Sequence, residues 1–594
     1  MTDHAVLVRR ALSAETAGEF DRRVDEQGRR LTDAIEAGTF DNDAVTVGLE
    51  LELYAVDGDG RLAELPADVF EGPAAKELGV HNAELNTAPS RLDDDGIRDQ
   101  AEAIAADLAA TRERAREHGL DVVLDAMWTV PPAGGTDAYL DDITVDRGGA
   151  TDEWDSGEDS DRGDASGESD DSGVGDTSSV DGTDDGGRSA GADRSRVVPG
   201  PGEGDPVVFA RNMRQDPRYA ALDNAALGRA GGILDLSVPG GERSFRTILF
   251  ESLATSIQPH VQVPDASAFP RYHNLAVRTL GPVLALATNS PFLPADCYDA
   301  DPERVVEEGH HELRVAAFEQ AMNRGFRKVR VPADLDAATD AVDHVVADDT
   351  YGPFLHEWLD EGANGGGGDD TGVDPAEGDR ETSDREPSDT EASSADDTGL
   401  GDCWEFEYKR GSFWRWVRGV ARGDAVEGAC DERSLRVEYR PLPTQPTVRD
   451  VVGFQVLTAG LLHGLAAADH PLCELPWDDA ERSFYAAVED GLAADLAWVT
   501  ADGEYTTDSD AVFAEVFAHA RRGLDDQGVS RSVRERYLDP LEARWERGTT
   551  PSMWKRRRVR AALADGADLA GALARMQREY AALSREHETF VDWL

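Results

Sequence analysis

The sequence predicts an α+β or mixed α/β protein, because strand-like and helix-like stretches alternate along it. Residues 44–57, which include VGLELELYAVD, alternate apolar and polar side chains as a strand does. Residues 96–119 have helical spacing of apolar residues and end at a glycine. Residues 121–132 again resemble a strand, which prolines close. The order strand, helix, strand supports this fold class.

Further elements are expected before and after this unit. Residues 5–38 look helical, and residues 81–90 look like a second strand. A continuous apolar pattern over residues 273–292 predicts a buried helix. The tail, residues 475–594, is predicted to be mostly helical.

The charge of the chain is strongly negative. Its 594 residues carry 119 acidic and 59 basic side chains, a formal net charge of −60. An Asp-rich surface with arginine in place of lysine is typical of a cytosolic protein in concentrated salt, where screening weakens the repulsion. The alternative is an acidic protein that binds basic partners. Nucleic acid is not an expected ligand.

We expect a cytoplasmic protein without a membrane-spanning segment. The N-terminus lacks the apolar core of a signal peptide, and no apolar run of about 18 residues occurs. The cysteines form no C-x-x-C pair, which indicates free thiols rather than a zinc site or a disulfide framework. They are Cys297, Cys403, Cys430 and Cys473.

Two long segments have a composition that cannot form a core. They are rich in Asp, Gly and Ser and almost without aliphatic side chains, so we predict disordered insertions in surface loops. The predicted organisation is a catalytic domain in three parts (1–147, 205–360 and 403–474), the insertions 148–204 and 361–402, and a helical C-terminal region, 475–594.

Glu50 and Glu52 raise the first question about chemistry. On one face of a strand, these two carboxylates would lie roughly 7 Å apart. Three further stretches, NAELN, PHVQV and LRVEYRP, also place charged or histidine side chains where a strand should be apolar. Each could be structural by itself. Carboxylates that converge require cations between them, and oxygen ligands with one imidazole suit Mg²⁺ or Mn²⁺. The residues concerned are Glu84, His260, Arg436, Glu438 and Arg440.

The order of these motifs resembles a known family. VGLELELYAVD, HNAELNTAP, SIQPHVQVPD, LGPVLALATNSPF and LRVEYRPLPTQPTV are similar to the motifs of the glutamate–cysteine ligase type 2 family, the carboxylate–amine ligases. The resemblance extends from about residue 45 to about residue 450, outside the insertions. It implies a glutamine synthetase-like antiparallel sheet with flanking helices, to which this chain adds the helical C-terminal region.

The resemblance also implies roles for single residues. Glu50, Glu52, Glu84 and Glu438 correspond to metal ligands, and His260 to a histidine near the nucleotide. Arg436 and Arg440 would face phosphates or the substrate carboxylate. The chain departs from the family at the first histidine of H-x-H, where Gln258 stands, followed by Pro259. Gln258 would then be a neutral oxygen ligand beside the nucleotide and the metals, or one metal would be held weakly.

The expected activity is that of an ATP-dependent ligase with Mg²⁺ or Mn²⁺. A carboxylate, the γ-carboxyl of glutamate, would attack the γ-phosphate of ATP, and an amine such as that of cysteine would displace phosphate from the acyl phosphate. Partners would be small molecules, and a homo-oligomer is compatible with the sequence. Two alternatives remain open: a non-catalytic nucleotide- or amino-acid-binding homologue, which Gln258 favours, and a phosphotransferase of related fold.

Overall fold

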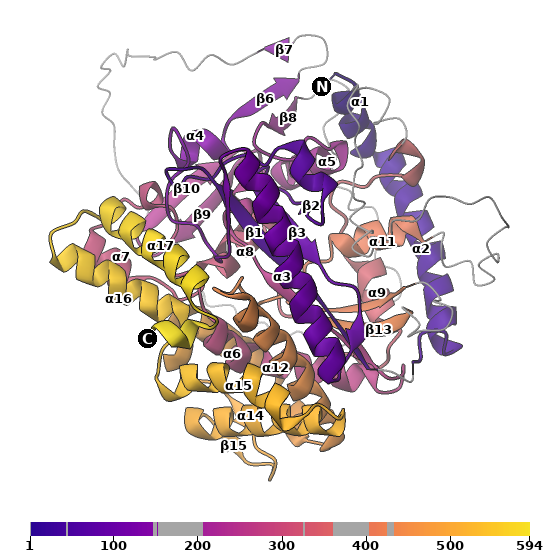
Figure 1. Ribbon diagram of the computed structural model, residues 1–594. Coiled ribbons are helices and arrows are strands. Elements are labelled where there is room, and N and C mark those ends of the chain that lie inside the picture. The colour runs from indigo at the N-terminus through magenta and orange to yellow at the C-terminus, as the bar shows by residue number, and fades with distance from the viewer. Residues whose placement is uncertain are drawn as a thin grey trace, which may run out of the picture.

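The computed structural model describes residues 2–42, 45–146, 151–152, 206–324, 327–359, 403–423 and 433–594. Within these ranges an antiparallel sheet is covered by helices, and further helices follow toward the C-terminus (Figure 1). The α+β class is therefore confirmed. Apart from Thr151–Asp152, the two predicted insertions lie outside the described residues.

The central sheet has eight strands among the described residues, with the order β12-β13-β11-β1-β3-β2 and with β4 and β5 also paired to β1. The strands, including those of three smaller sheets, are β1 (Thr46–Val56), β2 (Ala75–Lys76), β3 (Asn82–Asn86), β4 (Ser90–Arg91), β5 (Asp121–Val123), β6 (Ile143–Asp146), β7 (Thr151–Asp152), β8 (Val207–Ala210), β9 (Leu234–Val238), β10 (Gly241–Phe245), β11 (Ile257–Val263), β12 (Val417–Arg422), β13 (Ser434–Tyr439), β14 (Trp498–Val499) and β15 (Tyr505–Thr506).

β1 forms because its alternating side chains match the two faces of the sheet. Leu49, Leu51 and Leu53 are at most 2% exposed, whereas Glu50 and Glu52 remain partly exposed on the opposite face. The register pairs Glu50 with Gln258 of β11 and Glu52 with Glu84 of β3. A slip by one residue would move every leucine to the polar face, so the apolar pattern fixes this register.

The helices are α1 (Thr2–Ala11), α2 (Ala14–Glu36), α3 (Asp94–Glu117), α4 (Thr136–Leu140), α5 (Pro217–Ala230), α6 (Phe269–Ala287), α7 (Pro302–Glu308), α8 (Leu313–Met322), α9 (Asp340–Ala347), α11 (Trp404–Gly411), α12 (Val448–Ala467), α13 (Trp477–Asp490), α14 (Ser509–Asp526), α15 (Arg531–Glu546), α16 (Pro551–Ala564) and α17 (Leu569–Glu586). Local capping sets several of their ends. The Asp93 side chain accepts from the N–H of Gly96 at the start of α3, and Gly119 lies just beyond its end with φ +75°.

Helices α3, α6 and α12 pack on the sheet, and α14 and α15 pack against α12 farther from it (Figure 1). Among the described residues, α12 is the one helix that is long and apolar enough to cross a membrane. It is almost entirely buried among other elements, which is typical of a core helix in a large domain. The polar face of the sheet, which carries Glu50 and Glu52, contains the candidate functional site.

The C-terminal helices are joined to the rest of the protein by buried polar contacts. Lys555 of α16 donates to a carboxylate oxygen of Asp125 and to the carbonyl of Asn289. Gln577 of α17 donates to the other Asp125 oxygen at 2.6 Å. Lys555 and Asp125 are at most 1% exposed, so each charge depends on the other for compensation.

Several predicted elements differ in extent. The helix expected at 5–38 is two helices, because the Ser13 hydroxyl accepts from the N–H of Thr16 and starts α2. The strand expected at 121–132 ends at Val123, since the chain leaves the sheet to place Asp125 among its buried partners. The mostly helical tail also contains the short hairpin β14–β15. Cys297, Cys403 and Cys473 are free thiols, as expected, and Cys430 lies outside the described residues.

Candidate functional site

The polar face of the central sheet gathers charged side chains from β1, β3, β11 and β13. The first group is Glu50, His260 and Glu438, whose ligand atoms lie within 4.8 Å of one another. His260 is the cross-strand partner of Glu438, and its Nε2 lies 3.3 Å from a Glu50 carboxylate oxygen. The expected convergence of these three strands is thus observed. Two carboxylates and one imidazole at this spacing have the donor atoms of a divalent metal site.

Glu438 lies at the centre of an arginine cluster. Arg418 of β12 donates to both of its carboxylate oxygens, at 2.9 and 2.7 Å, and Arg440 donates to one of them. Burial favours the neutral acid, but the charges of Arg418 and Arg440 outweigh it and hold the pKa of Glu438 well below its usual range. Glu438 is therefore an ionised carboxylate at neutral pH.

The second group is Glu52, Glu84 and Glu77, and it lies next to the first along β1. Loss of water, followed by the charge of Glu77, raises the pKa of Glu52 to about 7. Loss of water also raises the pKa of Glu84, with added repulsion from Glu50, Glu77 and Glu52. Asn86 donates to Glu84 at 2.8 Å. A nearby cation would favour the ionised forms of carboxylates that repel one another in this way.

Gln258 joins Glu52 to the arginine cluster. Its amide nitrogen donates to a Glu52 carboxylate oxygen at 3.2 Å, and its amide oxygen accepts from Arg440. The N–H and hydroxyl of Ser256 also donate to Glu52, at 2.7 and 2.9 Å. Gln258 therefore faces the acidic groups despite Pro259. Its amide nitrogen contacts the Glu52 carboxylate and its amide oxygen contacts the Arg440 guanidinium.

A pocket of about 670 Å³ opens beside the first group. Glu50, His260 and Glu438 line it, and the guanidinium groups of several arginines surround it. These arginines are Arg410, Arg418, Arg422 and Arg436. The predicted site residue Arg436 thus lies in this pocket, whereas Arg440 lies toward the second group. Several arginines next to acids and a histidine can bind a polyanion whose charge a metal ion partly neutralises.

A second pocket, of about 590 Å³, opens beside Glu52 and Glu77. Arg314 of α8, Arg440 and the Trp416 ring line it, and the Arg314 guanidinium lies 5.4 Å from the centre of that ring. Glu251, in the 3-10 helix η2 (Ile248–Leu253), also lines the pocket and is 9% exposed. Its buried Oε1 has no hydrogen-bond partner. Burial, followed by the charges of Asp223 and Glu77, raises the pKa of Glu251 well above its usual value.

Several residues of this arrangement were not among the sequence candidates, including Glu77, Glu251, Arg314 and Arg418. Arg418 lies on an alternating strand and could have been found by its pattern, since β12 pairs with β13. Glu77 follows the two-residue strand β2, and Glu251 and Arg314 lie on helices. No local pattern in the sequence predicts that these three side chains lie close to the polar face of the sheet.

The family model for "Glutamate-cysteine ligase family 2 (GCS2)" matches residues 46–139 and 204–583. These ranges cover most of the chain, including the strands of the site and most of the C-terminal helices. The chain belongs to this family. The resemblance inferred from the motifs is therefore confirmed, and a ligase of the glutamate–cysteine ligase type is the class of protein indicated. A comparison with curated proteins finds no match.

Two solved structures resemble the chain at 13% sequence identity and a TM-score of 0.44. One is glutamate–cysteine ligase from Francisella tularensis in complex with AMP, and the match covers 92% of this chain and 90% of that one. The other is a bifunctional glutathione synthetase from Pasteurella multocida, of which the match covers 53%, about half its length. These likenesses are too distant to assign the role of any residue here.

Proposed function

We propose that the protein is an ATP-dependent carboxylate–amine ligase that forms an amide, with glutamate as the carboxylate substrate and an amine such as cysteine as the acceptor. One observation carries the proposal. Two adjacent groups of carboxylates on the polar face of the sheet lie between an arginine-lined pocket and a second pocket with mixed charges. A nucleotide and an amino acid that entered opposite pockets would meet at these carboxylates.

The donor set fits divalent metal ions. Glu52, Glu77 and Glu84 present carboxylate oxygens whose ionised forms repel one another, and an orphaned ring nitrogen, His260 Nε2, lies beside Glu50. We propose that Glu50, His260 and Glu438 hold one Mg²⁺ or Mn²⁺ ion and that Glu52, Glu77 and Glu84 hold another. When bound, these ions would neutralise phosphate oxygens and reduce the repulsion of an anionic nucleophile.

The arginine-lined pocket is the proposed nucleotide site. Arg418 keeps Glu438 ionised and in place through two hydrogen bonds. Arg436 and Arg422 line the same pocket, where guanidinium groups can bind phosphate oxygens bidentately. His260 lies at the boundary between this pocket and the carboxylates, so it would contact the phosphate end of the nucleotide.

The second pocket is the proposed amino-acid site. Arg314 and Arg440 would bind carboxylate groups, and Trp416 would cover the aliphatic part of the substrate. We propose that Glu251 binds an ammonium group, because a cation would satisfy its unpartnered oxygen and favour its ionised form. A zwitterion with two carboxylates and one ammonium, such as glutamate, complements these charges.

The reaction that follows has two steps. The substrate carboxylate attacks the γ-phosphorus of ATP and ADP leaves, giving an acyl phosphate. The amine nitrogen then attacks the acyl carbon, phosphate leaves and the nitrogen loses a proton. Arg440 lies between the two groups of acids and is positioned to stabilise negative charge that moves from the phosphate to the acyl oxygen.

The test is product analysis in high salt. The protein is incubated with ATP, Mg²⁺, oxygen-18-labelled glutamate and a mixture of amino acids, and products are identified by mass spectrometry. We expect an amide, and we expect one labelled oxygen in the released phosphate because the carboxylate oxygen bridges carbon and phosphorus in the intermediate. Glu50→Gln removes one proposed ligand and should abolish both signals, while Glu102→Gln, on the exposed side of α3, should retain them.

The outcomes separate the alternatives. Phosphate release that requires both glutamate and an amine supports the ligase. A stable phosphorylated product would identify a phosphotransferase, and nucleotide binding without turnover would identify a non-catalytic homologue. We further propose a cytoplasmic enzyme adapted to concentrated salt, on the evidence of the net charge of −60.

A further inference from the structure

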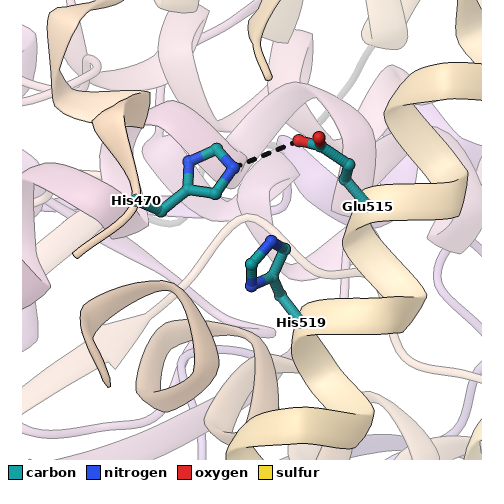
Figure 2. Close-up of side chains that lie close together, drawn as sticks. All are labelled: His470, Glu515 and His519. Carbon is teal, nitrogen blue, oxygen red and sulfur yellow. Dashed lines mark hydrogen bonds and ion pairs between the residues drawn. The ribbon is translucent and has the colours of Figure 1, made fainter. Parts of the chain in front are cut away.

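A second cluster of side chains that can bind a metal ion lies away from the central sheet, on α14 and at the start of the 3-10 helix η6 (Pro471–Glu474). It consists of His470, Glu515 and His519 (Figure 2). Glu515 and His519 are one turn apart on α14, so they share a face of that helix. His470 precedes η6 and is 2% exposed. His470 follows the C-terminal end of α12, and the close packing of α12 against α14 brings the three together.

We propose that His470, Glu515 and His519 bind a divalent transition-metal ion such as Zn²⁺. Their ligand atoms lie within 4.8 Å of one another, and His470 Nε2 lies 3.1 Å from Glu515 Oε2. Figure 2 shows a ring nitrogen of His519 directed toward this pair. Two imidazoles and one carboxylate are a ligand set of zinc, with a fourth position left for water.

Glu515 is already oriented as the ligand of a metal site would be. Trp498 Nε1 donates to its Oε2 at 2.7 Å, and the N–H of Ala501 donates to its Oε1 at 2.9 Å. These contacts hold the carboxylate in one position and leave a lone pair of Oε2 facing the imidazoles. The Glu515 side chain is 22% exposed, which gives an ion a route from solvent. Outer contacts of this kind increase metal affinity.

The proton of His470 occupies the place of the metal in the ion-free protein. The N–H of Leu472 donates to His470 Nδ1 at 3.2 Å, so the ring proton is on Nε2 and points to Glu515. Binding of a metal at Nε2 requires this proton to move to Nδ1, which removes one capping hydrogen bond of η6. The N–H of Leu472 should then exchange faster with deuterium when the metal binds.

The surrounding charges permit a cation. Arg271 donates to the carbonyl of His470 at 3.0 Å, but Asp469 forms an ion pair with that guanidinium at 3.2 Å. Glu515 supplies the negative charge that a divalent ion needs in a partly buried site.

Cobalt provides the test, because tetrahedral Co²⁺ absorbs visible light and replaces Zn²⁺ with little change of geometry. The protein is freed of metal with a chelator and titrated with Co²⁺ in excess Mg²⁺, a hard cation that would occupy the carboxylates of the sheet and that binds imidazole weakly. We expect visible bands at one equivalent, and their loss on addition of Zn²⁺. His519→Gln and Glu515→Gln should each weaken Co²⁺ affinity by about 100-fold or more, since even outer contacts contribute about 10–100-fold.

His587→Gln, outside the cluster, is the matched control and should bind Co²⁺ as the wild type does. Glu515→Gln keeps one oxygen, which can accept from Trp498 or from Ala501 but not from both, so His519→Gln, which leaves both contacts in place, is the cleaner test of coordination. Zn²⁺ should raise the melting temperature of the wild type and of His587→Gln, but not of the other two variants. Wild-type protein without visible bands, or equal affinity in Glu515→Gln and wild type, would show that the three side chains form a hydrogen-bonded structural cluster.

Discussion

Substitution of Glu52 by glutamine should stabilise the metal-free protein at alkaline pH while it abolishes ligation. Burial, followed by repulsion from Glu77, raises the pKa of Glu52 to about 7. The folded protein therefore prefers the protonated acid, and glutamine has nearly the shape of that acid. Ser256 and Gln258 can still donate to the remaining side-chain oxygen of glutamine, so the fold should persist.

The magnitude follows from the two pKa values. A group whose pKa is higher in the folded state loses stability as pH rises from the unfolded value toward the folded one. For Glu52 this window runs from about 4.5 to about 7. Each pKa unit corresponds to about 1.4 kcal/mol, so the full penalty above pH 7 is about 3 kcal/mol. Solvent in the adjoining pocket screens part of it, and we expect a gain of about 1–3 kcal/mol for the variant.

The assay is denaturant unfolding of the wild type and Glu52→Gln between pH 4.5 and 8.5, with and without Mg²⁺, in constant salt. The two unfolding free energies should be closest near pH 4.5, diverge progressively between about pH 5 and pH 7, and differ by a constant amount above pH 7. Mg²⁺ should recover the stability of the wild type more than that of the variant. Glu102→Gln, on the exposed side of α3, should follow the wild type throughout. Parallel pH curves for wild type and Glu52→Gln would refute the conclusion that burial and repulsion raise the pKa of Glu52 in the metal-free protein.

Three further predictions concern other parts of the protein. Lys555→Met should lower the unfolding free energy by about 3–5 kcal/mol in a denaturant melt at pH 7, because Asp125 would remain buried without its cation; melting unchanged from wild type would contradict it. Gln258→His should shift metal-dependent activity from Mg²⁺ toward Mn²⁺, since imidazole suits Mn²⁺ better, and identical metal titrations would place residue 258 outside the metal shell. Glu251→Gln should raise the KM for glutamate at least about tenfold without changing the KM for ATP, and should reduce the preference for glutamate over glutarate, which lacks the ammonium group; an unchanged preference would remove Glu251 from substrate recognition.

Much of the candidate site could be predicted from the sequence because a strand repeats every two residues. That period alone puts Glu50 and Glu52 on one face and the leucines between them on the other, and it does the same for Arg436, Glu438 and Arg440. The family resemblance then assigned these strands to one site and implied the roles of their charged residues. The helix expected at 273–292 was also found, as α6, because its apolar pattern is local.

Tertiary structure alone decided which of these charges meet. The register of β1 sets Glu52 opposite Glu84, and that of β11 sets His260 opposite Glu438. Register depends on the packing of whole strands, which no short stretch encodes. The approach of Glu77 to the acids, and the end of the predicted strand at Val123, likewise depend on contacts between distant segments.

The cluster of His470, Glu515 and His519 likewise depends partly on local pattern and partly on tertiary structure. The sequence determines that Glu515 and His519 share a helix face, because residues four apart on a helix are neighbours. It could not show that His470, more than forty residues earlier, would face them, since that contact requires α12, which ends just before His470, to pack against α14. Local periodicity thus fixed the direction of each side chain relative to its own element, and only the burial of apolar faces against one another fixed the neighbours that each side chain meets.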